Sequence, residues 1–396
     1  MTRLYRLVTT LLTLAILVTA CGGQPAAEDA ATPPEEAVAD TEESNAEAEA
    51  EEASGVEEVD TEATSTEEDG ADEAGTDETE AATAAGECDE GFRLLDHEML
   101  ATDPVCIPEN PERVVALDPA ALEVMLLTDQ KPVGAVSWLL AIYSNSYDYL
   151  APDIGGIEDV GFPPNLESIA ALNPDLIIVG FTEEYEELSQ IAPTLQYTLS
   201  GSGDWRRPME MAGEALNQSE AVSERFAEYE ARVATLADTI GDPSELEVSI
   251  LRVSSEQLMI NLVQSYPSVI VDDVGFARPE SQALSVEEAE GLYESAIGGF
   301  ISLEEIPRVD GDVVFVWSQE ATVEGNTEAD VYYQSIQDQP VWQTLEAVQN
   351  DRVYRVGGHW IGWGFYAAHA VIDDLFTYVA EVDPAEVAPN PFLGTE

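Results

Sequence analysis

The sequence predicts an α/β protein with two parallel-sheet lobes joined by one long helix. Three observations support this fold class. Short apolar runs rich in β-branched residues alternate with helical patterns, which is typical of parallel α/β units. A long amphipathic segment without an internal proline lies between two such regions. Part of the first region is repeated in the second, and a folded part of about 300 residues is long for a single core.

Residues 1–21 have the features of an export signal. Arg3 and Arg6 precede an uncharged run from Leu7 to Val18, which is shorter than the roughly 20 apolar residues that span a bilayer. The run ends in Thr19-Ala20-Cys21, which resembles the lipobox where bacterial lipoproteins are cleaved and acylated. We therefore expect a lipid on Cys21 to anchor the protein at the extracytoplasmic face of the cell membrane. The alternative is an ordinary signal with an incidental cysteine.

Residues 22–87 predict a disordered acidic tether. They hold 24 of the 80 acidic residues and contain no Lys, Arg or aromatic residue. Such a segment cannot bury enough apolar surface to offset the loss of chain entropy on folding. We expect it to act as a spacer between the lipid anchor and the folded part; an acidic interaction tail is the alternative.

Residues 88–110 begin the folded part and contain the other two cysteines. With Cys21 acylated, Cys88 and Cys106 remain as a pair in an oxidising compartment. We expect a disulfide, which contributes about 3 kcal/mol in the loop-entropy model. Metal binding by the two thiols is the weaker alternative.

The folded part is strongly acidic. From residue 88 onwards, 56 acidic residues face only 12 arginines and lysines. Nucleic-acid binding is excluded, because recognition of phosphates requires a basic face. The acidity is interpreted as a solvated surface, because the sequence contains no Asp-x-Asp-x-Asp-Gly calcium loop.

The lobe boundaries follow from the apolar runs. The N-terminal lobe, residues 111–207, contains the runs 114–117, 132–137 and 176–180. The C-terminal lobe, residues 241–396, contains the runs 248–254, 257–262, 313–318 and 352–357. Between the lobes, the spacing of apolar residues over 208–240 predicts one helix of roughly 50 Å.

A repeat supports the division into two lobes. Residues 165–179 align without a gap to residues 302–316. Each copy begins with a helix N-cap residue, Asn165 or Ser302, and has a glutamate two positions later. A short helix, a turn with an aspartate and a buried strand follow in each copy. One supersecondary unit therefore occurs once in each lobe.

Four stretches carry a resemblance to a known family. They are residues 111–136, 165–179, 248–260 and 340–375, in the order and spacing of that family. The chain resembles the periplasmic binding proteins that serve ferric siderophore, haem and cobalamin ABC importers. The resemblance implies two α/β lobes joined by one rigid helix, with the ligand between them and small hinge motion. It also implies a monomer that delivers a ferric siderophore to a permease dimer.

Six residues are candidates for contact with the ligand. Arg252 matches the ligand-contacting arginine of the family, and a charged residue in an apolar strand is costly without a partner. Its alternative role is an inter-lobe salt bridge. Trp138 follows a strand at its carboxyl end, where open α/β sheets bind ligands. Trp360, in a glycine-rich loop before the last long helix, is preferred to Trp363. The weaker candidates are Tyr143, Phe181 and Arg278.

The histidines do not predict a metal site. Of His97, His359 and His369, only His359 falls in a loop expected near the cleft. A protein-bound metal needs a cluster of such ligands. We expect no resident metal or cofactor other than the lipid on Cys21, and any iron to arrive already chelated.

Glu167 and Glu304 occupy the same position in the two copies of the repeat. The resemblance implies that each meets arginines on one of the two permease subunits. The alternative is that each only stabilises the start of its own helix through the helix dipole.

Three other function classes compete with siderophore binding. They are a binding protein for cobalamin or haem, a secreted carboxylate-based hydrolase, and a surface adhesion module. The sequence contains no Gly-x-Ser-x-Gly elbow, no His-Glu-x-x-His pair and no phosphate loop. We therefore expect no enzymatic activity.

Overall fold

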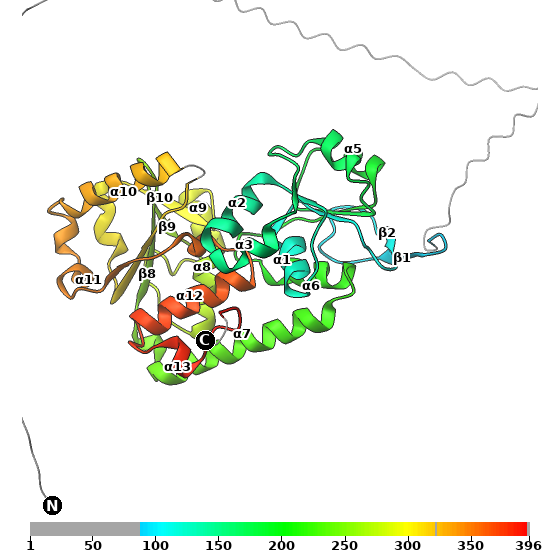
Figure 1. Cartoon of the computed structure of the whole chain (residues 1–396). Coiled ribbons are helices and arrows are strands. Elements are labelled where there is room, and N and C mark those ends of the chain that lie inside the picture. The colour runs from blue at the N-terminus through cyan, green and yellow to red at the C-terminus, as the bar shows by residue number, and fades with distance from the viewer. Residues whose placement is uncertain (1–87, 321–322, 394–396) are drawn as a thin grey trace, which may run out of the picture. The chain divides into compact units, whose positions relative to one another are not determined.

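The computed structural model describes residues 88–320 and 323–393, which form two lobes (Figure 1). The signal expected at residues 1–21, the lipidation site Cys21 and the tether expected at 22–87 lie outside the described residues. No described helix is long and apolar enough to cross a membrane.

Residues 88–110 contain an antiparallel hairpin of β1 (Phe92–Leu95) and β2 (Val105–Pro108). A disulfide joins Cys88 to Cys106, whose Cα atoms are 5.7 Å apart. This is the pairing expected from the sequence. Arg93 on β1 donates hydrogen bonds to the backbone carbonyls of Glu214 and Ala215, at 2.6 and 3.0 Å. The hairpin is therefore fastened to the end of helix α6 (Arg206–Ala215).

The N-terminal lobe contains a five-stranded parallel sheet in the order β5-β4-β3-β6-β7. The strands are β3 (Val114–Ala116), β4 (Gly134–Ala135), β5 (Glu158–Asp159), β6 (Leu176–Val179) and β7 (Thr194–Gln196). The helices are α1 (Pro119–Leu127), α2 (Ser137–Ser146), α3 (Ala151–Ile154), α4 (Leu166–Ala171) and α5 (Tyr185–Ile191). β3 and β6 are buried on both faces, which explains why their sequences are continuously apolar.

The C-terminal lobe contains a five-stranded sheet in the order β10-β9-β8-β11-β12. The strands are β8 (Val248–Val253), β9 (Leu258–Asn261), β10 (Gly298–Ile301), β11 (Val313–Trp317) and β12 (Val353–Arg355). The main helices are α8 (Tyr266–Val274), α9 (Val286–Tyr293), α10 (Val323–Gln337) and α12 (Phe365–Tyr378). Shorter segments include η3 (Leu303–Val309), α11 (Glu346–Gln349), η5 (Gly358–Ile361) and α13 (Pro384–Val387).

The second sheet differs from the expected parallel arrangement at one strand. β9 runs antiparallel to both β8 and β10, whereas β8, β11 and β12 are parallel. A tight turn connects β8 to β9, with the amide of Ser254 donating to the carbonyl of Gln257 at 3.0 Å. A parallel pair needs a crossover connection of a dozen residues or more. The short spacing between the runs 248–254 and 257–262 therefore required a hairpin.

The single helix expected at residues 208–240 is interrupted, so this prediction was wrong. α6 ends at Ala215, and α7 (Ser219–Ile240) begins after a break. Asn217 adopts the left-handed conformation, with φ of 59°. The amide of Gln218 donates to the carbonyl of Gly213 at 2.6 Å, which closes α6 as a Schellman motif. α7 alone is the long helix between the lobes, and its 22 residues extend over about 33 Å.

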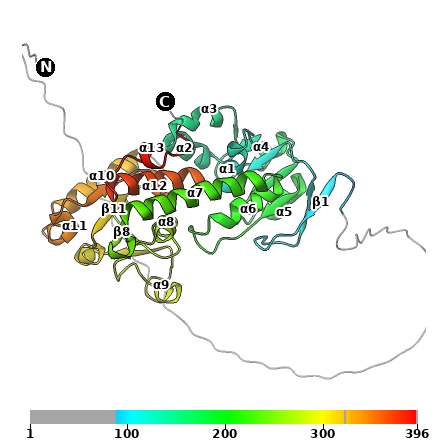
Figure 2. The same ribbon diagram turned by 90° about the horizontal axis from the view of Figure 1, so that it is seen from below.

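One hydrophobic core extends from the N-terminal sheet through α7 and α12 to one face of the C-terminal sheet. Ile250 and Phe315 belong to this core, whereas their neighbours Leu251 and Val316 belong to a second core on the opposite face. α7 and α12 lie side by side (Figure 2). Because the lobes share close-packed side chains along these helices, their relative motion is restricted.

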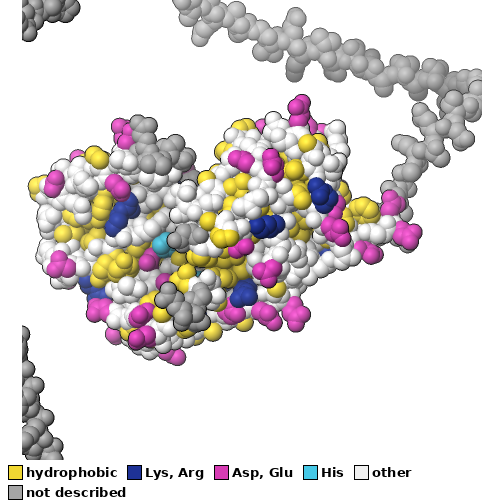
Figure 3. Space-filling model, viewed as in Figure 1, with side chains coloured by type: hydrophobic (Ala, Val, Ile, Leu, Met, Phe, Trp, Pro, Cys, Tyr) yellow, Lys and Arg dark blue, Asp and Glu magenta, His cyan; other side chains and the backbone are white. Residues whose placement is uncertain are grey.

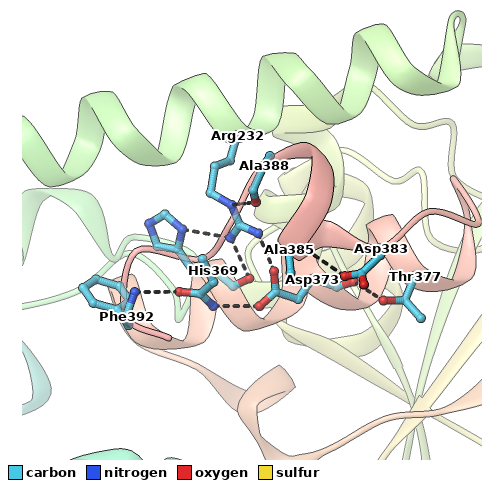
Figure 4. Close-up of polar contacts among 9 residues, drawn as sticks. Arg232, His369, Asp373, Thr377, Asp383, Ala385, Ala388 and Phe392 are labelled. Carbon is cyan, nitrogen blue, oxygen red and sulfur yellow. Dashed lines mark hydrogen bonds and ion pairs between the residues drawn. The ribbon is translucent and has the colours of Figure 1, made fainter. Parts of the chain in front are cut away.

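Arg232 fastens the C-terminal segment to α7 and α12 (Figure 4). From α7 it donates to the carbonyls of His369 and Ala388, at 3.0 and 2.9 Å, and pairs with Asp373. Asn390 donates to the other oxygen of Asp373 at 2.7 Å. Burial and the neighbouring Arg232 lower the pKa of His369 to about 3, so its ring is neutral. We call this group of residues the C-terminal latch.

Candidate ligand-binding site

A cleft of about 920 Å³ lies between the two lobes. One wall is the exposed side of α2, which follows β4 in the N-terminal lobe. The other wall is formed by the segments that follow β11 and β12 in the C-terminal lobe. The carboxyl ends of parallel strands from both sheets therefore meet at this cleft, which is where open α/β sheets bind ligands. The space-filling view shows the face of the protein seen in Figure 1 (Figure 3).

Two tryptophans meet in the cleft, one from each lobe. Trp138 is on α2, and Trp363 precedes the start of α12. Their ring centroids are 5.3 Å apart with an interplanar angle of 67°, an edge-to-face contact. Both side chains are half-buried, so each keeps exposed ring surface for an apolar or aromatic part of a ligand.

Arg252 lies at the carboxyl end of β8, directly beside the cleft wall. It donates to the carbonyl of Gln319 at 3.0 Å and lies 5.0 Å above the ring of Trp317. Its nearest carboxylate is Glu320, at 3.9 Å. Gln319 and Glu320 both line the cleft. Because Glu320 belongs to the same lobe as Arg252, the alternative inter-lobe salt bridge is not seen among residues 88–320 and 323–393.

Arg355, at the end of β12, is the arginine that lines the cleft itself. It pairs with Asp330 on α10 at 2.8 Å and also donates to the hydroxyl of Ser318. Neutral polar groups of Asn145 and Asn326 lie along the same walls. The cleft thus combines two tryptophans, one lining arginine with a second beside it, and several amides, which can bind oxygen-rich ligands with apolar parts.

Beneath the cleft, a buried carboxyl group joins the lobes. Glu123 on α1 accepts a hydrogen bond from the hydroxyl of Tyr143 at 2.5 Å and from the amide of Phe365 at 2.7 Å. Phe365 is the first residue of α12, so the carboxyl group of one lobe caps the helix of the other. A side chain on Gly364 would collide with Glu123. Burial raises the pKa of Glu123 to about 7.

Three of the six predicted contact residues are buried away from the cleft. Trp360 has no exposed surface; its ring stacks on Phe315 and its indole nitrogen donates to Asp374. Tyr143 is 2% exposed, and its hydroxyl group donates a hydrogen bond to Glu123. These two residues do not line the cleft, because an aromatic residue in a glycine-rich loop can equally well complete a core, and because Tyr143 lies on the buried side of α2.

Arg278 is also structural. It donates to the carbonyls of Val248 and Asn261 and to the side chain of Gln282. Val248 begins β8, so Arg278 lies at the strand end opposite Arg252. Burial lowers the pKa of Arg278 to about 10. Phe181 follows β6 and is 74% exposed, but it does not line the cleft.

Of the predicted residues, Trp138 lines the cleft and Arg252 lies beside it, whereas Trp363 and Arg355 line the cleft without having been chosen from the sequence. Arg355 could have been found, because it ends a strand in the same way as Arg252 and basic residues are rare in this chain. The sequence favoured Trp360 over Trp363, but the structure places Trp363 in the cleft, because the outcome depends on which way the loop turns before α12.

Glu167 and Glu304 are exposed at the starts of α4 and η3. The caps of these segments involve other side chains. Asn165 accepts from the amide of Ser168 at 2.8 Å, and Glu305 accepts from the amide of Ser302 at 3.0 Å. Both glutamates therefore remain accessible.

No group of three or more His, Cys, Asp or Glu side chains within 88–320 and 323–393 could hold a metal ion. His359 lines the cleft, but its Nε2 lies 2.7 Å from Asp374, the same carboxylate that binds Trp360. This contact orients the ring of His359 within the wall of the cleft.

Comparisons with known proteins agree with this architecture. Residues 114–358 match the family model described as "Periplasmic binding protein". The chain is 32% identical over 296 residues to the "Probable siderophore-binding lipoprotein YfiY" of Bacillus subtilis, covering 72% of this chain and 87% of the relative. It is 28% identical over 281 residues to the achromobactin-binding periplasmic protein of Dickeya dadantii, covering 67% of this chain and 85% of the relative.

A solved structure gives the same result. The structure of Staphylococcus aureus SirA complexed with staphyloferrin B matches with a TM-score of 0.62 and 25% identity, covering 72% of this chain and 98% of SirA. The family match spans both five-stranded sheets and most of the residues that line the cleft. The chain therefore belongs to the periplasmic binding protein family.

Proposed function

We propose that this protein captures a ferric siderophore in the inter-lobe cleft and delivers it to the permease of an ABC transporter. The observation that carries the proposal is the cleft itself, with Trp138 and Trp363 facing each other and arginines at two strand ends. Ferric siderophores present oxygen donors and apolar or aromatic parts, which these side chains bind. The names of the relatives support the same ligand class.

Titration of the tryptophan fluorescence tests the proposal. We expect quenching with micromolar or tighter affinity by at least one ferric siderophore, because Trp138 and Trp363 lie in the cleft. Haem, cobalamin and iron-free siderophores serve as comparison ligands. Saturable binding of haem or cobalamin without binding of any ferric siderophore contradicts the proposal and supports the other branch of the family.

The same screen addresses the hydrolase alternative. A binding protein releases its ligand chemically unchanged, so mass spectrometry of the ligand after incubation should show no new species. Hydrolysis of the siderophore, or of model esters and glycosides, contradicts a purely binding role.

We further propose that the protein is monomeric and is anchored through a lipid on Cys21 at the extracytoplasmic face of the cell membrane. The relatives include lipoproteins and a periplasmic protein. Cys21→Ala should move the protein from the membrane fraction to the soluble fraction. Retention of the variant in membranes after a salt wash contradicts the lipid anchor.

The proposed docking residues for the permease dimer are Glu167 and Glu304, one in each lobe. Their exposure, and the use of other side chains as caps, support this role. Paired charges of this kind set orientation and association rate. The double variant Glu167→Ala with Glu304→Ala should abolish siderophore uptake while ligand affinity remains unchanged. Normal uptake by the double variant at wild-type protein levels contradicts docking through these residues.

A further inference from the structure

Positive and negative side chains around the cleft are balanced, and this balance restricts the net charge of the ligand. Lining the cleft are one arginine, Arg355, and two carboxylates, Glu320 and Asp330. Arg252 stands directly behind Glu320. Among the side chains that the structure describes here, the two positive charges are therefore matched by two negative charges, and these side chains offer no net positive charge to an anion.

The pair of Arg252 and Glu320 is close without being hydrogen-bonded. The nitrogen and oxygen are 3.9 Å apart. Arg252 Nε and Glu320 Oε1 are both buried and have no hydrogen-bond partner among the described residues. Glu320 lines the cleft and keeps its negative charge beside Arg252. An anionic ligand next to this pair is repelled by Glu320 as well as attracted by Arg252, which reduces its gain in free energy.

Arg355 also has a carboxylate partner, and here the pair is hydrogen-bonded. Asp330 holds its guanidinium group at 2.8 Å, with side-chain exposures of 32% for the arginine and 59% for the aspartate. An anionic ligand would have to approach Arg355 alongside Asp330. Repulsion between Asp330 and the ligand thereby reduces the attraction between Arg355 and the ligand.

The rest of the protein adds to this effect. From residue 88 onwards, acidic residues outnumber arginines and lysines 56 to 12. Figure 3 shows isolated basic side chains among more numerous acidic ones on this face. A summed negative potential slows the approach of anions and favours neutral or cationic ligands.

Given the siderophore-binding function proposed above, we infer that the cleft takes ferric complexes of low net charge, of the hydroxamate class. Three hydroxamate groups together neutralise Fe(III), whereas three catecholates, as dianions, leave a strongly anionic complex. Hydroxamates also present carbonyl and N–O oxygens next to alkyl chains, which match the amides and tryptophans of the cleft.

Competition among defined ferric complexes tests the inference. The probes are ferrichrome (neutral trihydroxamate), ferrioxamine B (cationic trihydroxamate), ferric enterobactin (anionic tricatecholate) and ferric citrate. We expect at least one trihydroxamate to bind about tenfold or more tightly than either anionic complex, because like-charge contacts are costly. Lowering the salt concentration should widen the difference.

The outcomes separate this inference from the proposed function. Tighter binding of ferric enterobactin or ferric citrate overturns the inference but leaves siderophore capture intact. Binding of none of the four complexes overturns both.

Variants that remove one charge each test whether the two cleft carboxylates cause the preference among ferric complexes. Asp330→Asn and Glu320→Gln each remove one negative charge from the cleft, and each should shift the affinity ratio towards ferric enterobactin by about fivefold. The matched control is Glu328→Gln, which removes the same charge from α10 at an exposed position outside the cleft. An equal shift in the control overturns the inference, because selection would then depend on total charge alone.

Discussion

The cleft and the buried polar contacts of α12 both involve charged side chains where the lobes meet, but they satisfy those charges differently. Arg232 in the C-terminal latch uses every nitrogen of its guanidinium group on α12 or the C-terminal segment. Arg252 beside the cleft leaves Nε without a partner. Both arginines lie among apolar residues in the sequence. Arg232 therefore holds buried segments together, whereas Arg252 keeps unused hydrogen-bonding capacity beside the proposed ligand site.

The largest effect is expected for the latch. Arg232→Ala should lower the free energy of unfolding by about 3–5 kcal/mol, because Asp373 is left without its buried partner. Urea unfolding followed by tryptophan fluorescence measures the change. Arg225→Ala, on the same helix, is the control: Arg225 pairs with the exposed Glu228 one turn away and lies over the ring of Phe392, so its removal leaves no buried carboxylate without a partner. Equal stabilities of the two variants contradict the structural role of the latch.

Ionisation of Glu123 should destabilise the folded protein as the pH rises, whereas most carboxyl groups destabilise it as the pH falls. Its folded-state pKa of about 7 exceeds the ordinary 4.5, so the folded protein binds this proton more tightly than the unfolded chain. Stability is therefore lost as the pH rises from about 4.5 to 7, by roughly 3 kcal/mol.

The variant Glu123→Gln removes this titration while keeping a donor and an acceptor at the same place. We expect its stability relative to wild type to increase between pH 5 and pH 8 and then to level off. Urea unfolding at several pH values measures the difference, and other titrating groups cancel in the comparison. A constant difference at all pH values contradicts the raised pKa.

Arg252 should affect the ligand and not the fold. Arg252→Ala should weaken binding of a ferric siderophore by about 1.5–3 kcal/mol, the range for hydrogen bonds to charged groups. The free energy of unfolding should change little, because this arginine is incompletely hydrogen-bonded in the free protein. Lost stability with unchanged affinity would assign Arg252 to the structural group together with Arg232.

The smallest effect concerns the two tryptophans. A double-mutant cycle with Trp138→Ala and Trp363→Ala should give a coupling of about 0.5–1.5 kcal/mol in stability, the value for an edge-to-face pair. Zero coupling would show that the rings meet across the cleft without holding the lobes together.

Much of the fold could be predicted because it depends on local patterns. All seven predicted strand runs correspond to strands, from β3 to β12. Very short strands, such as β5 with two residues, contain too few apolar residues to be recognised from the sequence. The break at Asn217 was missed because apolar periodicity continues on both sides of it, and only the tolerance of asparagine for positive φ marked the position.

The site was less predictable than the fold because it depends on contacts between distant segments. The burial of Tyr143 requires Glu123, and the opposite orientations of Trp360 and Trp363 require Asp374 and Trp138. The pairing of Arg355 with Asp330 joins β12 to α10. No spacing in the sequence specifies these contacts, since each forms only after the sheets have packed.

The core that α7 and α12 share between the lobes has a kinetic consequence. Wide spontaneous opening would require close-packed side chains such as Phe226 and Phe365, whose rings are 4.7 Å apart, to separate. Ligand exchange in the free protein should therefore proceed through rearrangement of the cleft rim, and the residence time of the ligand should be set by contacts in the cleft. Rapid release of the ligand would then require a partner that separates the two lobes. The ligand could in that case dissociate slowly from the free protein and quickly from the complex with that partner.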